Sequence, residues 1–382
     1  MPQRLPLAAL LAGAVLAAGP ALAQDPIKLG FHAPLTGFAA ADGKSARQGA
    51  ELAVAQANAE GGVGGRKVEL VVFDDQGKPD QAVPIANRLI GEKVPVVVSG
   101  SYSGPTRAAA PVFQQAGMPY LSSYAIHPDI TRAGDHMFRT SFTGEVQGKA
   151  GAKLIGETLG KKRVVMITLN NDFGQSLAAG FKEIAGRFGI QIVKEYSYGM
   201  PDRQFGPLVA SVKADNPDAI YASGYFFNAG PLVAQLRAAG VTAQVVGQEG
   251  YDGQKFIEIA GPAAEGVIIT TSLDRDSKAV ETRKFIEEYE KANPDSKVDM
   301  VAASTHTATR LAIAALRGAG TTDRKKIRDT IAASKMEVST GTISFNQLGE
   351  VRKAVQNQIV RGGAWRFHSM IDDPVLLAPP EK

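Results

Sequence analysis

Short apolar runs alternate with amphipathic stretches along most of this chain of 382 residues. The apolar run at 94–98 is rich in β-branched residues, which predicts a buried parallel strand. The stretch 44–58 instead places small residues such as Ala46 and Ala50 at helical spacing, which predicts a helix packed closely on a sheet. The same strand–helix unit repeats from 27–31 to the end of the chain. This alternation predicts an α/β fold of doubly wound parallel sheets with helices on both faces.

The chain is long enough to need more than one hydrophobic core. Its 382 residues exceed what a single core usually covers, so we expect two lobes. The two strand–helix series meet near Thr140. In open α/β sheets a ligand sits beyond the carboxyl ends of the strands. With two lobes facing each other, that place is the cleft between them.

The stretch 94–126 contains the first candidate for a binding site. Its strand at 94–98 is followed by a turn, Ser-Gly-Ser-Tyr-Ser-Gly at 99–104, and by Pro105, a residue favoured at the first position of a helix. Unpaired backbone N–H groups at a helix start bind anions well, and Ser103 adds a hydroxyl beside them. The turn therefore indicates a carboxylate site, although an ordinary cap that satisfies its own helix fits the same residues.

Two strand ends in the second half of the chain add matching chemistry. Tyr225 follows the strand predicted at 219–222, and Glu249 follows the strand predicted at 245–246. A carboxylate at a strand end in a cleft is suited to pair with an ammonium group. Each feature alone fits a surface loop equally well. Together with the turn before Pro105, they indicate a zwitterion site, with one end for a carboxylate and the other for an ammonium group.

The first residues are typical of a targeting segment. Arg4 precedes an apolar run at 5–18 that is too short to span a membrane, and small residues at 21–23 predict cleavage after Ala23. We therefore expect the mature chain to be exported. The sequence has no cysteine, which rules out a disulfide, a zinc–thiolate site and a lipoprotein anchor. Its net charge of +4, or +3 without Arg4, is too slight to indicate nucleic-acid binding.

The enzymatic alternatives have weaker support in the sequence. The run GFAAADGKS at 37–45 lies between a strand and a helix, but five residues instead of four separate Gly37 from Gly43, which would misalign the backbone of a phosphate-binding loop. The five histidines lack metal-ligand spacing, and we expect each of them at the surface or in a loop. We expect Asp74 and Asp75 at a solvated strand end. No nucleophile–base pair is visible, so we expect neither an enzyme nor a metal or other cofactor.

Many segments, in a fixed order, are shared with one family. From the N-terminus they are IKLGFHAPLTG, GAELAVAQANAEGGVGGRKVEL, DDQGKPDQAVPIANRLI, PTRAAAPVFQQAGMPYLSS, MFRTS, NNDFGQS, NPDAIYASGY, GQEGYDG and AEGVIIT. Over essentially the whole mature chain, the protein resembles the periplasmic binding proteins of branched-chain amino acid uptake systems. The resemblance implies a type I periplasmic-binding-protein fold, a location in the periplasm and a hinge of three crossing strands. Lobe I would be about 25–141 plus 273–351, and lobe II about 142–272 plus 352–382.

The resemblance also implies roles for particular residues. In that family the ligand's carboxylate is held by the serine that matches Ser103 and by backbone groups at the positions of Tyr124 and Ile126. The ammonium group is held by the carboxylate that matches Glu249, and the tyrosine that matches Tyr225 closes over the ligand from lobe II. Hinge closure would exclude water and strengthen these charged pairs. The closed form would be recognised by the membrane permease of an ABC importer.

Three positions near the expected site depart from the family. Asp42 and Phe173 stand where the family has tyrosines, so one position gains a carboxylate and the other loses a hydroxyl. Tyr102 replaces a family cysteine, so the family's disulfide in lobe I is absent and the Tyr102 ring could line the pocket. These departures leave the ligand's side chain open.

The resemblance leaves two ligand classes to be distinguished. The first is a small amino acid, branched-chain or related, delivered to an ABC importer. The second is an aromatic or other small carboxylic acid, or an amide, with Tyr102, Tyr124 and Phe173 stacking on a ring. A ligand carrier for a chemotaxis receptor or another sensor would use the same site. We expect a monomer whose partners are this ligand and the permease, with no nucleic acid.

Overall fold

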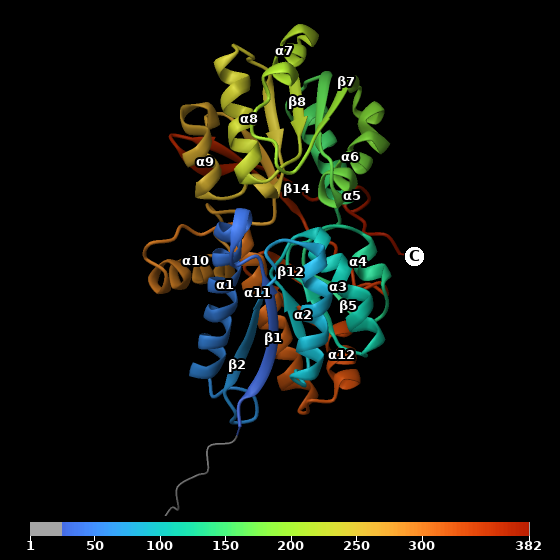
Figure 1. Ribbon diagram of the computed structural model, residues 1–382, viewed down its shortest axis with the longest axis vertical. Coiled ribbons are helices and arrows are strands. Elements are labelled where there is room, and N and C mark those ends of the chain that lie inside the picture. Colours follow the sequence, from blue (N-terminus) through green and yellow to red (C-terminus); the bar gives the residue numbers. More distant parts are fainter. Residues whose placement is uncertain (1–24, 382) are drawn as a thin grey trace, which may run out of the picture.

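The computed structural model describes residues 25–381. The leader predicted at 1–23, with its cleavage after Ala23, lies outside these residues. The described part forms two α/β lobes, one above the other in Figure 1, each built on its own sheet. None of its helices combines the length and the apolar character that crossing a membrane requires. The α/β fold expected from the sequence is confirmed.

The sheet of the first lobe has five strands, all parallel, in the order β2-β1-β3-β4-β5. These strands are β1 (Ile27–Ala33), β2 (Val68–Asp74), β3 (Val97–Ser99), β4 (Tyr120–Ser122) and β5 (Met137–Arg139). The strand order reverses between β1 and β3. The connections that leave these two strands therefore diverge over opposite faces of the sheet and open a crevice between them.

The sheet of the second lobe has seven strands in the order β14-β13-β10-β9-β8-β6-β7. They are β6 (Arg163–Leu169), β7 (Gln191–Tyr198), β8 (Ala219–Ala222), β9 (Gln244–Gly247), β10 (Ile268–Thr271), β13 (Val355–Arg361) and β14 (Ala364–Ile371). The first five are parallel, whereas β13 and β14 run antiparallel at one edge. The order reverses between β6 and β8, as it does in the first lobe.

Helices and a small hairpin complete both lobes. The hairpin is β11 (Lys335–Val338) with β12 (Gly341–Ser344). The α-helices are α1 (Ala40–Ala59), α2 (Pro79–Gly91), α3 (Ser103–Gln115), α4 (Asp129–Arg132), α5 (Gly144–Lys153), α6 (Asp172–Ile184), α7 (Gly206–Asp215), α8 (Phe226–Ala238), α9 (Gln254–Ala260), α10 (Val280–Ala292), α11 (Met300–Ala319) and α12 (Arg324–Ala332). Short helical turns are η1 (Gly37–Ala39), η2 (Leu154–Thr158), η3 (Ala185–Phe188), η4 (Glu249–Tyr251) and η5 (Gly261–Ala264).

Both faces of each sheet are covered, because side chains alternate between the faces along every strand. Along β3, Val97 packs into a core with α2 and α3, whereas Val98 packs into a core with α1 and α11. Along β6, Val164 packs into a core with α5 and α6, and Val165 into one with α8. Such runs of apolar residues, which pack on both faces of a strand, are the sequence signal that predicted buried parallel sheets.

The chain passes between the lobes three times. It leaves the first sheet after β5, returns after β10 to form α10, α11 and α12, and leaves again after β12 to form β13 and β14. Helix α11 packs on α1 and against β3, so this late segment belongs to the first lobe. In Figure 1 the orange helices accordingly lie beside the blue strands. A buried ion pair, Arg139 Nε to Glu350 Oε2 at 2.9 Å, joins two of the crossing segments.

Two local predictions are wrong, each for a physical reason. Strand β3 begins at Val97, later than the apolar run itself, because Pro95 has no N–H to donate to a sheet ladder. Helix α3 begins at Ser103 rather than Pro105, since first-turn N–H groups have no helical partner and proline fits there. The stretch 37–45, where the sequence argues against a phosphate-binding loop, is helical, formed by η1 and the start of α1.

The predicted surface position of His32 and the predicted solvated position of Asp75 are also wrong. Both side chains are fully buried. His32 Nδ1 lies 2.6 Å from Asp75 Oδ2, and its Nε2 lies 2.7 Å from Tyr120 Oη. Each polar group is satisfied by a partner distant in the sequence, which a local pattern does not reveal.

Candidate functional site

Most of the predicted ligand-binding residues lie in the segments that follow the strands at which the strand order of each sheet reverses. In the first lobe, Asp42 lies on α1 after β1, and Tyr102 and Ser103 form the start of α3 after β3. In the second lobe, Phe173 lies in the first turn of α6 after β6, and Tyr225 precedes α8 after β8. Both sets therefore flank the reversal of strand order in their sheet, where open α/β sheets bind ligands.

One cavity between the lobes brings together seven of the eight predicted residues: Asp42, Tyr102, Ser103, Tyr124, Phe173, Tyr225 and Glu249. The eighth, Ile126, is fully buried, and its backbone N–H donates a hydrogen bond to Ser103, which lines the cavity. The lining residues that the sequence analysis missed are Ala125, Gly250, Met300 and Val301. Met300 and Val301 begin α11, and nothing local in the sequence marks that helix start as part of a distant cleft. The roles of all these residues in ligand binding stay predictions.

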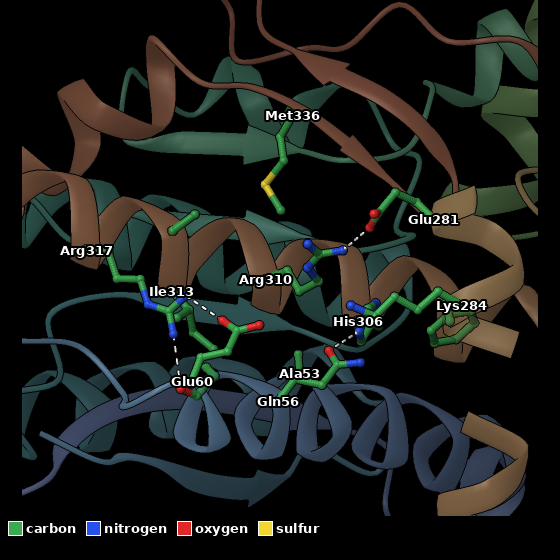
Figure 2. Close-up of a pocket in the computed structure, with 13 residues that line it drawn as sticks. Ala53, Gln56, Glu60, Glu281, Lys284, His306, Arg310, Ile313, Arg317 and Met336 are labelled. Carbon is green, nitrogen blue, oxygen red and sulfur yellow. Dashed lines mark hydrogen bonds and ion pairs between the residues drawn. The ribbon is translucent and has the colours of Figure 1, made fainter. Parts of the chain in front are cut away.

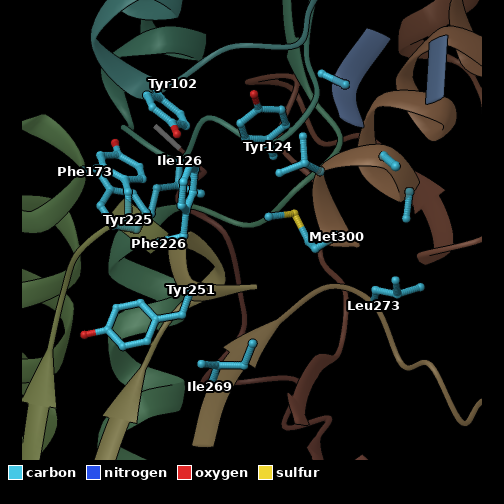
Figure 3. Close-up of a cluster of buried hydrophobic side chains, with 14 of the residues drawn as sticks. Tyr102, Tyr124, Ile126, Phe173, Tyr225, Phe226, Tyr251, Ile269, Leu273 and Met300 are labelled. Carbon is cyan, nitrogen blue, oxygen red and sulfur yellow. The ribbon is translucent and has the colours of Figure 1, made fainter. Parts of the chain in front are cut away.

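Aromatic rings line this cavity, and Figure 3 shows those of Tyr102, Phe173 and Tyr225 close together. Tyr102 stacks on Tyr225 across the cleft with ring centroids 4.1 Å apart, and Tyr225 stacks on Phe173 at 4.8 Å. The space that is left measures about 20 Å³, close to the least that holds one water molecule. An amino acid therefore fits only after the ring of Tyr102 moves or the lobes separate.

The polar side chains that the first lobe contributes to the cavity are paired within that lobe. Ser103 Oγ accepts a hydrogen bond from the backbone N–H of Ile126 at 3.1 Å. Tyr124 Oη donates to a backbone carbonyl of the turn after β3 at 2.6 Å, and Tyr102 Oη donates to Asp42 Oδ2 at 2.6 Å. Because Ser103 acts as an acceptor in its bond, its own hydroxyl proton is available for a ligand carboxylate.

The two carboxylates of the cavity both hold their protons more tightly than usual. Burial raises the pKa of Asp42 to about 8, against the hydrogen bond from Tyr102, and the nearby charges of Asp299 and Asp252 raise it as well. Burial also raises the pKa of Glu249 to about 8. Neither carboxylate oxygen of Glu249 has a hydrogen-bond partner among residues 25–381. Such a buried, unpaired carboxylate is costly, which makes Glu249 a candidate acceptor for an additional hydrogen-bond donor.

Lys353 is a buried cation near the cleft that the sequence analysis missed. Its ammonium donates to the carbonyl of Thr140 at 3.3 Å, which places it where two crossing segments meet. Burial lowers the pKa of Lys353 to about 7, and the negative charge of Glu249 opposes this shift. The charge of Lys353 in turn favours the ionised form of Glu249. No local signal could have found this residue, because only the path of the chain between the lobes brings it to Glu249.

Side-chain contacts join the two lobes beside the cavity. Asp252 of the second lobe accepts the backbone N–H of Met300 at 3.2 Å and pairs with the guanidinium of Arg275. At the rim, Arg107 Nε of α3 lies 2.9 Å from Asp172 Oδ2 of α6. The structure therefore shows the two lobes closed on each other.

A second cavity, of about 210 Å³, lies within the first lobe between α1, α10 and α11 (Figure 2). The ion pair of Arg310 with Glu281 lines it, and so does His306, whose Nε2 lies 2.8 Å from Gln56 Oε1. Burial lowers the pKa of His306 to about 3. The predicted surface or loop position of His306 is therefore wrong, because its neighbours on the packed helices cover it. None of the predicted ligand-binding residues lines this cavity.

Two α/β lobes closed over a cavity at both points of strand reversal define a bilobal solute-binding protein. Residues 26–359 match the family model described as periplasmic binding protein, and the chain belongs to that family. The family consists of substrate-binding transport proteins of bacterial ABC importers, which implies a periplasmic location. The resemblance and the type I fold expected from the sequence are confirmed.

Relatives with known ligands fall into two groups. The leucine-, isoleucine-, valine-, threonine- and alanine-binding protein of Pseudomonas aeruginosa is 29% identical over 334 residues, which are 87% of this chain and 88% of the relative. The substrate-binding protein LivJ of Streptococcus pneumoniae, solved with isoleucine, is 27% identical with a TM-score of 0.85, covering 91% of this chain and 99% of its own. A binding protein of R. palustris, solved with benzoate, is 25% identical with a TM-score of 0.82, covering 90% and 96%.

Proposed function

We propose that this protein captures a small amino acid, branched-chain or related, between its lobes and delivers it to an ABC importer. The observation that carries the proposal is Glu249, which is 3% exposed, lines the cavity and has no hydrogen-bond partner for either carboxylate oxygen among the described residues. An ammonium group supplies both a charge and the missing donors. The hydroxyl of Ser103, with the backbone at Tyr124 and Ile126, would hold the carboxylate from the other lobe.

Binding of this kind makes and breaks no bond. The ligand would meet the first lobe, and hinge closure would bring Glu249 and Tyr225 over it. The lobes would divide at about 25–141 plus 273–351 and 142–272 plus 352–382. We also propose a monomer that is exported after cleavage at Ala23, which mass spectrometry and size-exclusion chromatography of the exported protein would check.

A second ligand class, aromatic or other small carboxylic acids and amides, is favoured by a different observation. Tyr102, Tyr225 and Phe173 stack with centroid spacings of 4.1 and 4.8 Å, so flat surfaces already lie in the cavity. A ligand ring would replace Tyr102 between its neighbours. The R. palustris relative solved with benzoate uses the same fold.

A thermal-shift screen of the ligand-stripped mature protein would separate the two classes. A ligand present at about 100 times its dissociation constant adds roughly 2.7 kcal/mol to the stability of the folded state. We expect amino acids to raise the melting temperature and their des-amino analogues to leave it unchanged. The reverse result, with shifts from benzoates and none from amino acids, would transfer the assignment to aromatic acids.

A further inference from the structure

Two carboxylates line the same cavity, one from each lobe. Asp42 comes from α1 of the first lobe and Glu249 from η4 of the second. Their exposed fractions are 9% and 3%. Among residues 25–381, no lysine, arginine or histidine lines the cavity. A single α-ammonium group accounts for one of these acids, which leaves the other without a ligand group to match it.

Asp42 is the acid whose charge lacks a cationic partner among residues 25–381. Glu249 feels the positive charge of Lys353, and Asp252 pairs with Arg275. The hydrogen bond to Asp42 comes from the neutral hydroxyl of Tyr102, and the charges that act on Asp42 are those of other acids. Removing a carboxylate from water without a counter-charge is costly, so a cation placed here would gain strongly.

The walls beside Asp42 suit the same kind of group. The rings of Tyr102, Tyr124, Tyr225 and Phe173 line the cavity. Aromatic faces attract cations, and the attraction grows when water is excluded. A carboxylate in a cavity lined by aromatic rings is therefore matched to an ammonium or guanidinium group rather than to a branched alkyl chain.

We infer that the ligand's side chain carries a positive charge that Asp42 receives, so the site prefers a cationic amino acid to leucine, isoleucine or valine. The inference rests on the proposed function, since it takes Ser103 and Glu249 as the partners of the α-carboxylate and α-ammonium groups. When the ligand enters, the Tyr102 ring rotates away from the cavity. Its hydrogen bond to Asp42 breaks, and the ligand's cation takes its place beside the carboxylate. This movement also makes room in a cavity of about 20 Å³.

Matched ligand pairs test the inference without any variant. Lysine and norleucine share one carbon chain and differ by the terminal ammonium group, as ornithine and norvaline do. Calorimetric titration of the ligand-stripped protein should show each cationic member binding at least tenfold more tightly than its neutral partner. Equal or tighter binding of norleucine and norvaline would overturn the inference.

Asp42→Asn assigns the effect to the residue. This change keeps the shape of the side chain and removes its charge, so the lysine-to-norleucine preference should disappear. A preference that survives in Asp42→Asn would overturn the assignment to Asp42. The preference in the wild type should also grow with pH, by at most tenfold per unit, because lysine binds only after Asp42 has lost its proton. Comparing the two ligands cancels the titration of Glu249 and Lys353, which affects both ligands alike. The charged and polar groups around Asp42 are Asp299, Asp252, Tyr102 and, beside Asp252, Arg275.

The outcomes distinguish this inference from the proposed function. If neutral amino acids bind in a way that depends on Glu249, and lysine does not bind, the proposed function stands and the inference fails. If no amino acid binds and an aromatic acid does, both fail.

Discussion

The two halves of the cleft differ in how their polar groups are satisfied. In the first lobe, Ser103 bonds to Ile126 and Tyr102 to Asp42, so that half is organised by its own contacts. In the second lobe, both carboxylate oxygens of Glu249 lack partners among the described residues. Under the proposed function, the first half would be ready to meet a ligand, whereas the second would gain its partner only when the lobes close around one.

The largest expected effect on ligand affinity comes from Glu249 of the second lobe, whose carboxylate oxygens lack partners among residues 25–381. Glu249→Gln removes the charge that meets the α-ammonium group, and breaking a buried ion pair costs roughly 3–5 kcal/mol. We expect amino-acid affinity in calorimetric titration to fall by more than about 100-fold. The matched control is Glu258→Gln, a change on the exposed face of α9, which should leave the affinity unchanged. A loss of only a few fold would show that Glu249 does not contact the ammonium group.

The next effect concerns stability and Asp42. The pKa of Asp42 is raised in the folded state from 3.8 to about 8, so the stabilisation from its bound proton is present below pH 3.8 and is lost as pH rises towards 8. Asp42→Asn should therefore gain stability relative to the wild type as pH rises, by at most about 1.4 kcal/mol per pH unit. Urea unfolding of both proteins between about pH 4 and about pH 8 measures this difference. A difference that does not change with pH would contradict the raised pKa.

A smaller effect is expected where the lobes are joined. Asp252→Ala removes the acceptor for the N–H of Met300 and the partner of Arg275. The closed form should become less populated, so ligand affinity should fall about tenfold, or about 1.4 kcal/mol. Small-angle scattering of the ligand-free variant should show a larger radius of gyration. Asp276→Ala, which removes an exposed acid paired with Arg366, is the control and should match the wild type in both measurements.

The smallest effect is expected at the rim. The ring of Phe38 meets Phe227 edge-on across the cleft at 5.1 Å and is 36% exposed. Such pairs contribute about 0.5–1.5 kcal/mol, so Phe38→Ala should weaken binding about threefold. Phe367→Ala, an equally large change on exposed β14, should have no effect on binding. A tenfold or greater loss of ligand affinity for Phe38→Ala would indicate that Phe38 contacts the ligand directly.

The sequence determined the class of fold and singled out most of the residues that line the cavity between the lobes. Apolar β-branched strands alternating with helices specify parallel sheets, because a strand buried on both faces consists mostly of apolar residues. Strand ends in such sheets are where ligands bind, which is why Ser103, Tyr225 and Glu249 could be singled out before any contact was known. Each of these residues closely follows a predicted strand or precedes a predicted helix, so the sequence around it is enough to identify it as a candidate.

Only the tertiary structure decided the charge balance of the cleft. The bond from Tyr102 to Asp42, the arrival of Met300 at the cavity and the burial of Lys353 beside Glu249 all depend on segments that are distant in the sequence. A carboxylate's burial and pKa are properties of everything packed around it, so no pattern within its own element reveals them. The sequence therefore established a two-lobed binding protein, and the fold decided which charges face the ligand.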